Sequence, residues 1–250
     1  MKPLILTAIL SLSVISCVYA QEKTASQKNN LVKINITSLP FKNISLQYER
    51  ILNKKISVAI SGRIMPTSSV PFKNIILESS SDDPDTKEAI ESLRINTTAI
   101  TPEVRFYLGK KGYGQGFYLA PFYRYATFEG SDMKFDYTTS LGAQRSIFLA
   151  GKLTTHTGGI LLGTQWLLSN RFCLDVWWLG PHYGVGNGTF SGTTSIPLTP
   201  FEQNEIRQEL EDLDIPFTKK TVTVNANGAS MKLDGPWGGV RAGVSLGLRF

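Results

Sequence analysis

The stretch VRAGVSLGLRF, residues 240–250, alternates apolar side chains with small or charged ones. Successive side chains of a β-strand point to opposite faces, so one face of this segment would be apolar and the other would carry Arg241, Ser245 and Arg249. A run of roughly eleven residues is what a tilted β-strand needs to cross the hydrocarbon of a bilayer. The segment therefore predicts a membrane-crossing strand, with the edge strand of a soluble sandwich as the alternative.

The amino-terminal residues have the pattern of an export signal. Lys2 precedes an apolar run over residues 4–15, and Val18-Tyr19-Ala20 offers a small-residue cleavage site. This pattern predicts a secretory signal peptide over 1–20. A second interpretation treats Val14-Ile15-Ser16-Cys17 as a lipobox, which would make Cys17 a lipidated first residue. Beyond this segment no run reaches about 18 apolar residues, so any membrane crossing must use strands.

Alternating segments bounded by turn residues predict eight strands in the remainder of the chain. Short turns follow the second, fourth and sixth strands, whereas the segments after the third, fifth and seventh, residues 66–93, 128–153 and 183–236, are long. Bacterial outer-membrane barrels show the same asymmetry between their two ends. We therefore expect a short linker over 21–30 and an all-β, eight-stranded antiparallel up-and-down transmembrane β-barrel over 31–250, with long external loops. The strands are expected at about 31–39, 43–52, 55–65, 94–109, from 117, up to 168, at 172–182 and up to 250.

Two of the long loops contain helix signals. Thr199-Pro200-Phe201-Glu202 combines an N-cap threonine, a proline at the first helical position and a glutamate three residues after the cap. Ile206, Leu210 and Leu213 follow at helical spacing. Asp85-Thr86-Lys87-Glu88 opens a second, shorter helical segment. We expect both helices to lie over the external mouth with their acidic sides outward. The stretches 133–138 and 221–224 alternate as well, which predicts that hairpins within these loops project beyond the bilayer and leaves the strand count open.

Charged side chains share the non-aliphatic face of the predicted strands. An apolar core would hold them only at high cost, whereas inside a membrane barrel they can pair with one another. We therefore predict a stabilising charge network in the barrel interior. Its members are Glu49, Arg63, Glu103, Arg105, Arg124, Asp175 and Arg241. Eight strands enclose a space that side chains can fill, so this network would close the lumen.

Four motifs carry a family resemblance: NISLQYER (43–50), EVRFYL (103–108), GFYLAP (116–121) and LDVWWLG (174–180). They resemble an uncharacterised family of small outer-membrane barrels from Bacteroidota-type bacteria, within the broad OmpA/OmpX/OmpW class. The resemblance covers most of 31–250 and implies a fold and an outer-membrane location but no assigned reaction. The terminal residues Val244, Leu246, Leu248 and Phe250 resemble the signal by which the barrel-assembly machinery recognises the last strand of such barrels.

Composition limits the function classes. The net charge of +6 is spread over strands and turns without a basic block, so nucleic acid is not an expected partner. The histidines are His156 and His182, and Cys173 is the one cysteine after the signal peptide. Such a set gives no His/Cys metal cluster, and we predict neither a metal nor a cofactor.

We expect a monomeric, non-enzymatic protein that contacts outer-membrane lipid and lipopolysaccharide and has a structural or surface-recognition and adhesion role. Loops 66–93 and 183–236 are the candidate contact regions for an external protein or glycan ligand. Two alternatives stay open. A lipid A acylhydrolase or acyltransferase needs a histidine, a serine and an acid near the membrane rim, and both His182 and His156 have a suitable height. A narrow pore would need a wider barrel than eight strands give.

Overall fold

The computed structural model describes residues 28–79, 84–213 and 217–250. The predicted signal peptide, including Cys17, and the predicted linker up to residue 27 lie outside these residues. No helix within the described ranges is long and apolar enough to span a membrane.

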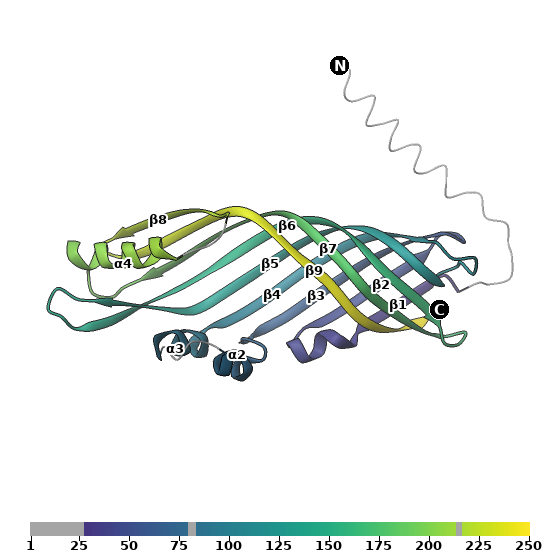
Figure 1. Ribbon diagram of the computed structural model, residues 1–250, viewed down its shortest axis with the longest axis horizontal. Helices are drawn as coiled ribbons and strands as arrows, with labels where there is room; N and C mark the ends of the chain where they lie inside the picture. Colours follow the sequence, from purple (N-terminus) through teal and green to yellow (C-terminus); the bar gives the residue numbers. More distant parts are fainter. Residues whose placement is uncertain (1–27, 80–83, 214–216) are drawn as a thin grey trace, which may run out of the picture.

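The described residues form an antiparallel sheet whose strands follow one another around a ring (Figure 1). The strands of the ring are β1 (Asn30–Asn35), β2 (Ile44–Ile51), β3 (Ile56–Ser69), β4 (Arg94–Tyr107), β5 (Gly116–Thr138), β6 (Gln144–Leu167), β7 (Phe172–Thr193) and β9 (Gly228–Arg249). Each strand from β1 to β7 pairs with the next, β7 pairs with β9, and β9 pairs back with β1. This last pairing places Leu31 opposite Arg249 and closes the sheet. The predicted antiparallel up-and-down topology is therefore confirmed.

A further strand, β8 (Lys219–Asn225), lies outside the ring. It forms a hairpin with β9, which is its one neighbour in the described sheet. Val222 and Val224 of β8 lie opposite Met231 and Ala229 of β9. The eight predicted strands thus form the ring, and β8 is an addition to them.

The two ends of the ring differ, as the lengths of the connections predict. Short turns at 52–55, 108–115 and 168–171 connect strands at the end where the carboxy-terminus lies (Figure 1). At the other end β5, β6, β7 and β9 continue well beyond the shorter strands β1 to β4. We call this projecting part the extension. It consists of residues 126–138, 144–155, 184–193 and 219–237.

The extension corrects two of the predicted loops. Residues 128–153 are strand apart from the turn at 139–143, and residues 183–236 contain β8, a helix and long parts of β7 and β9. The strands continue because they keep pairing with one another and bury apolar side chains against the helix. The sequence does not predict this continuation in β7, because Gly184, Gly186 and Gly188 interrupt the alternation of apolar side chains.

The first predicted strand, 31–39, is also too long. β1 ends at Asn35, whose side chain accepts a hydrogen bond from the backbone N–H of Ser38 at 3.1 Å. This bond caps the short 3-10 helix η2 (Ile36–Phe41). Pro40 within η2 has no N–H to contribute to a sheet. Both features favour the turn over a longer strand.

The helix α4 (Pro200–Asp212) packs on the extension. Ile206 and Leu210 are buried in a cluster with apolar side chains of β5, β6, β8 and β9. Leu149 in this cluster has the same parity along β6 as the interior residue Gln165, so α4 covers the side of the sheet that continues the inside of the ring. The exposed residues on the opposite side of the helix include Glu209, Glu211 and Asp212.

Two shorter helices, α2 (Lys73–Ser79) and α3 (Pro84–Ser92), connect β3 to β4 at the same end of the ring (Figure 1). The helix signal at Asp85 corresponds to α3, whereas α2 was not predicted. Lys134 Nζ of β5 lies 2.7 Å from Glu88 Oε2 of α3 and 3.2 Å from Asp136 Oδ2. The hydrogen bond to Glu88, followed by that to Asp136, raises the pKa of Lys134. This lysine therefore stays charged and ties α3 to the extension.

The predicted capping box begins α4. The backbone N–H of Glu202 donates to the hydroxyl of Thr199 at 3.4 Å, and the backbone N–H of Thr199 donates to Glu202 Oε2 at 2.8 Å. The bond from the Thr199 backbone, followed by that from its hydroxyl, lowers the pKa of Glu202. The contribution of this carboxylate to stability is therefore present at neutral pH and is lost as the pH falls through the lowered pKa.

Removing this cap gives a first testable prediction. Thr199→Ala is expected to cost about 1 kcal/mol, because the backbone N–H of Glu202 loses its acceptor and the carboxylate of Glu202 loses the hydroxyl that donates to it. The amides of α4 should then exchange with solvent roughly fivefold faster, as measured by hydrogen exchange and mass spectrometry. Gln208→Ala, on the exposed side of α4, is the matched control. Equal exchange in the two variants would mean that packing alone holds the helix.

The ring is apolar outside and polar inside, the reverse of the arrangement in most globular domains. Large apolar side chains are exposed on the outward face of every strand of the ring, with Ile34, Leu46 and Ile60 as examples. The side chains of Lys33 and Arg105, by contrast, are completely buried. The interior of the ring is therefore where charged groups meet.

Candidate functional site in the interior of the ring

Four strands meet in the interior through a single lysine. Lys33 Nζ of β1 lies 2.5 Å from Glu49 Oε2 of β2 and 2.7 Å from Asp175 Oδ2 of β7. It also donates a hydrogen bond to Gln165 of β6. All four side chains are buried. They converge because each occupies an inward position of its alternating strand.

Arg105 of β4 crosses the same space. Its Nη1 lies 2.7 Å from Asp175 Oδ2 and 3.2 Å from Glu49 Oε2, and its Nη2 lies 2.7 Å from Glu103 Oε1. The other oxygen of Glu103 lies 3.1 Å from Nη1 of Arg241 on β9. Every carboxylate in this group therefore contacts at least one base.

Tyrosine hydroxyls complete the hydrogen bonding of two carboxylates. Tyr107 Oη donates to Glu49 Oε1 and Tyr118 Oη donates to Asp175 Oδ1, each at 2.7 Å. Tyr118 reaches this position by lying across Gly163, where a Cβ would collide with the tyrosine ring. A glycine is thus required at this position of β6 for the tyrosine to enter the interior.

We call Lys33, Glu49, Glu103, Arg105, Asp175 and Arg241 the ionic network. Its three acids balance its three bases, which limits the cost of burying them together. The network brings together five of the predicted interior residues, whereas Arg63 and Arg124 are not joined to it. Lys33 was missed, although its alternation with Val32 and Ile34 places it on the inward face.

An apolar layer separates the ionic network from the end with the short turns. Leu31, Ile51 and Cys173 form a buried cluster, and Leu167 packs against it. Each of these three residues lies on the same face of its strand as Lys33, Glu49 or Asp175, two residues closer to the short turns. The apolar layer and the ionic network together fill this half of the ring with side chains.

A cavity of about 330 Å³ lies on the other side of the ionic network, toward the extension. We call it the vestibule. Arg63 and Arg124 line it and are half-buried, and neither makes an ion pair with any carboxylate that the structure describes. The full lining is Asn43, Ser45, Ser61, Arg63, Thr97, Arg124, Phe128, Trp177, His182 and residues 237–242.

The two histidines lie on opposite faces of the sheet. His156 of β6 faces outward, where its Nδ1 lies 2.6 Å from Tyr123 Oη and its ring contacts Tyr125. His182 of β7 faces the vestibule, where its ring packs edge-on against Phe122 and its Nδ1 is buried without a hydrogen-bond partner. Within the described ranges, no group of three or more His, Cys, Asp and Glu side chains is arranged to hold a metal ion.

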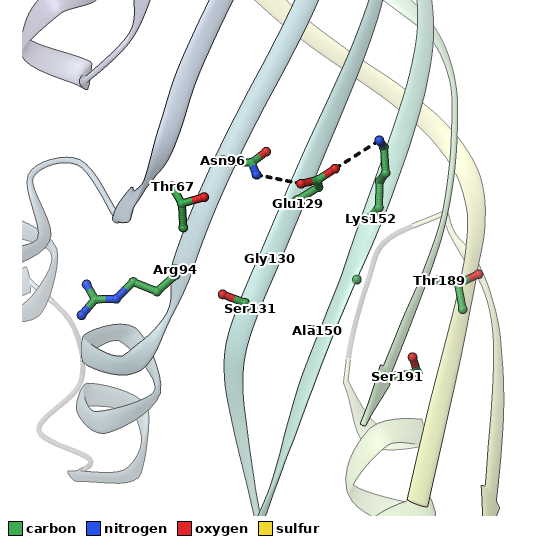
Figure 2. A pocket seen from close by; sticks show the side chains of 11 residues that line it. Thr67, Arg94, Asn96, Glu129, Gly130, Ser131, Ala150, Lys152, Thr189 and Ser191 are labelled. Atoms are coloured by element: carbon green, nitrogen blue, oxygen red, sulfur yellow. Dashed lines mark hydrogen bonds and ion pairs between the residues drawn. The ribbon is translucent and has the colours of Figure 1, made fainter. Parts of the chain in front are cut away.

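An open groove crosses the outward face of the extension (Figure 2). Glu129 of β5 lies between Asn96 of β4 and Lys152 of β6, accepting a hydrogen bond from Asn96 Nδ2 at 2.7 Å and lying 3.1 Å from Lys152 Nζ (Figure 2). The bond from Asn96, followed by that from Lys152, lowers the pKa of Glu129, so its carboxylate is ionised at neutral pH. Thr189 and Ser191 of β7 line the far side of the groove (Figure 2).

The residues of the predicted assembly signal lie along β9 where the ring closes. Leu246, Leu248 and Phe250 are exposed on the outward face, and Val244 is half-buried. The backbone N–H of Phe250 donates to the carbonyl of Asn30 at 2.9 Å, and the carbonyl of Phe250 accepts from Asn30 at 3.1 Å. The apolar residues of this segment therefore flank the seam between β9 and β1.

No curated protein matches the chain. A family match covers residues 8–186, which run from within the predicted signal peptide to the beginning of the extension part of β7. The matched part includes Lys33, Glu49, Arg105 and Asp175 of the ionic network, whereas Arg241 follows it. Because the match covers more than half of the 250 residues, the chain belongs to the family described as "Protein of unknown function (DUF3575)".

Proposed function

We propose that this protein is an outer-membrane β-barrel with a sealed lumen, which acts in surface recognition or adhesion through its extension and carries out no catalysis. It resides in the outer membrane of a Gram-negative, Bacteroidota-type bacterium and is exported by the signal peptide over 1–20. The observation that carries the proposal is the combination of an exposed apolar outer face with a buried ionic network.

The apolar band on the outward face of the ring extends along the ring axis over about the thickness of the hydrocarbon core of an outer membrane. On β6, roughly ten residues separate Trp166 from His156, which at a rise of ~3.3 Å per residue and a tilt of ~40° span about 25 Å. A band of about this height between two aromatic margins is typical of outer-membrane barrels. Exposed aromatic residues at one margin include Phe106, Phe117, Trp166, Phe172 and Phe250, and those at the other include Tyr123, Tyr125 and Tyr183.

This band is the surface that outer-membrane lipid and lipopolysaccharide would contact. Beyond the tyrosine margin, the outward face of the sheet carries charged and amide side chains. Asn96, Glu129 and Lys152 line the outward groove there. Such groups suit the polar headgroup region and the external medium. The outward residues of β9, Leu246, Leu248 and Phe250, would be the part that the barrel-assembly machinery recognises.

The extension supports the recognition role. It carries α4 with its exposed acidic side, and α2 and α3 lie at the same end of the ring. The described parts of the predicted contact regions 66–93 and 183–236 therefore lie at the same margin of the band. A rigid, largely paired surface of this kind can present hydrogen-bonding groups to a protein or glycan without ordering a loose loop first.

Neither alternative activity gains support from the interior. A pore would have to pass both the ionic network and the apolar layer of Leu31, Ile51 and Cys173. A lipid A acylhydrolase or acyltransferase would need a histidine next to a serine and an acid. His156 bonds to Tyr123, and Nδ1 of His182 has no partner in the described part of the chain.

Site-directed labelling tests the location and orientation together. Leu141→Cys places a thiol at the tip of the β5–β6 hairpin, where Leu141 is 94% exposed, and Asn170→Cys places one in an exposed short turn. A membrane-impermeant maleimide should label the first variant in intact cells and the second only after the outer membrane is permeabilised. The unsubstituted chain, with its buried Cys173, is the control. Labelling of both variants in intact cells, or recovery of the protein from the soluble fraction, would refute the proposal.

A further inference from the structure

The vestibule holds two positive charges that no acid in its lining balances. The ionic network is neutral by itself, and Arg63 and Arg124 come in addition to it. Neither makes an ion pair with a described carboxylate, Arg63 makes no hydrogen bond with any described residue, and the vestibule lining contains no acid. Half-burying two guanidinium groups side by side is unfavourable unless a counter-charge is present.

The third arginine of the vestibule is held in a fixed position. Arg241 forms its ion pair with Glu103, and its Cζ lies 4.8 Å from the centre of the Trp177 ring. Arg124 uses Nη1 for a single hydrogen bond, to Thr101 Oγ1 at 3.2 Å. Most of the N–H donors of the three arginines therefore remain free to bind a ligand.

His182 lines the same cavity. Its Nδ1 is buried and has no hydrogen-bond partner in the described residues, which is unfavourable for a polar atom. Its ring reaches the vestibule because residue 239 is glycine, where a Cβ would lie 2.9 Å from Nε2 of the histidine. The imidazole therefore adds a polar group to the wall of the vestibule, beside the arginines.

We propose that the vestibule binds a small dianion of the phosphate class, either free phosphate or a phosphomonoester. Two unbalanced charges match a dianion, whereas a monocarboxylate would offset only one of them. The planar guanidinium group presents paired donors that fit phosphate oxygens. Tetrahedral oxygens can accept from Arg63, Arg124 and Arg241 together, because these arginines approach from β3, β5 and β9. This inference depends only on the closed ring. A failure of the proposed outer-membrane location or recognition role of the protein would therefore not contradict it.

Titration of the full-length protein in detergent micelles tests this site. Inorganic phosphate is added at constant ionic strength, with chloride as the balancing ion, and binding is measured by isothermal titration calorimetry. Arg63→Gln and Arg124→Gln are each expected to weaken phosphate binding about tenfold or more, since each removes charged donors. Lys152→Gln removes an exposed cation of the outward groove and should bind phosphate like the parent protein.

The outcomes separate the two ligand sources. Tighter binding of glucose 1-phosphate than of phosphate would assign the site to a phosphomonoester, and the reverse would assign it to free phosphate. Heat-modifiable electrophoretic migration confirms that each variant folds. If Arg124→Gln does not fold, Arg124→Lys keeps the charge without the paired donors and should still weaken binding. The proposal is overturned if neither anion binds better than chloride, or if the folded arginine variants bind as the parent does.

Discussion

Replacing Arg105 by alanine is expected to lower the free energy of unfolding by about 3–5 kcal/mol, the effect of removing one partner from a buried ion pair. Arg105 is completely buried and contacts Glu49, Glu103 and Asp175. Its removal leaves these three carboxylates with two bases instead of three. The side chains of all three carboxylates are completely buried, so the loss of a paired base is costly there.

Urea unfolding in detergent, followed by tryptophan fluorescence, measures the effect. Lys152→Ala is the matched control, because it removes an ion pair at the surface, where such pairs contribute about 0–1 kcal/mol. Adding Asp175→Asn to Arg105→Ala should recover part of the loss, since one unbalanced carboxylate disappears. An Arg105→Ala variant that unfolds at the same urea concentration as the parent would show that the ionic network does not hold the ring together.

A second large effect is expected for Leu162→Arg on the outward face of β6. Leu162 lies opposite Leu119 on one side and Leu179 on the other, near the middle of the apolar band. If lipid surrounds this band, an arginine there should cost about 2–4 kcal/mol in folding stability measured in bilayers. In water the same change should be nearly neutral, because Leu162 is already 46% exposed.

Phe148→Arg is the control for this prediction. Phe148 lies on the same strand and the same face, is 52% exposed, and belongs to the extension beyond the tyrosine margin. Its replacement should change stability by no more than about 0.5 kcal/mol. Folding into phospholipid vesicles, with urea as the denaturant, compares the two variants. Equal stabilities would contradict the assignment of the band to the hydrocarbon of a membrane.

The closed sheet could be predicted because it depends on local alternation and on turn residues. Segments such as 43–52 and 94–109 alternate clearly, and the structure places β2 and β4 within a residue or two of those bounds. The capping box at Thr199 was equally local, and α4 begins where it predicts. Features that depend only on residues close together in the sequence can therefore be predicted from it.

The partners within the interior could not be predicted in the same way. Alternation tells which face a side chain occupies, but the position along the ring axis depends on the register between strands. Arg63 and Arg105 share the inward face, yet Arg105 lies in the ionic network and Arg63 lies in the vestibule. The inward position of Lys33 could have been inferred from its parity alone, while the length of the extension depends on packing against α4.

The seam between β1 and β9 has a consequence for the order of folding. It brings Asn30 to Phe250, whereas each other pairing in the ring joins consecutive strands or, for β7 and β9, strands separated by α4 and β8. Contacts between residues so distant in sequence form late, because the chain between them must be ordered first. Until then the sheet has two unpaired edges, on β1 and β9, that can pair with other chains. Protection from aggregation is therefore gained only at the last step of folding.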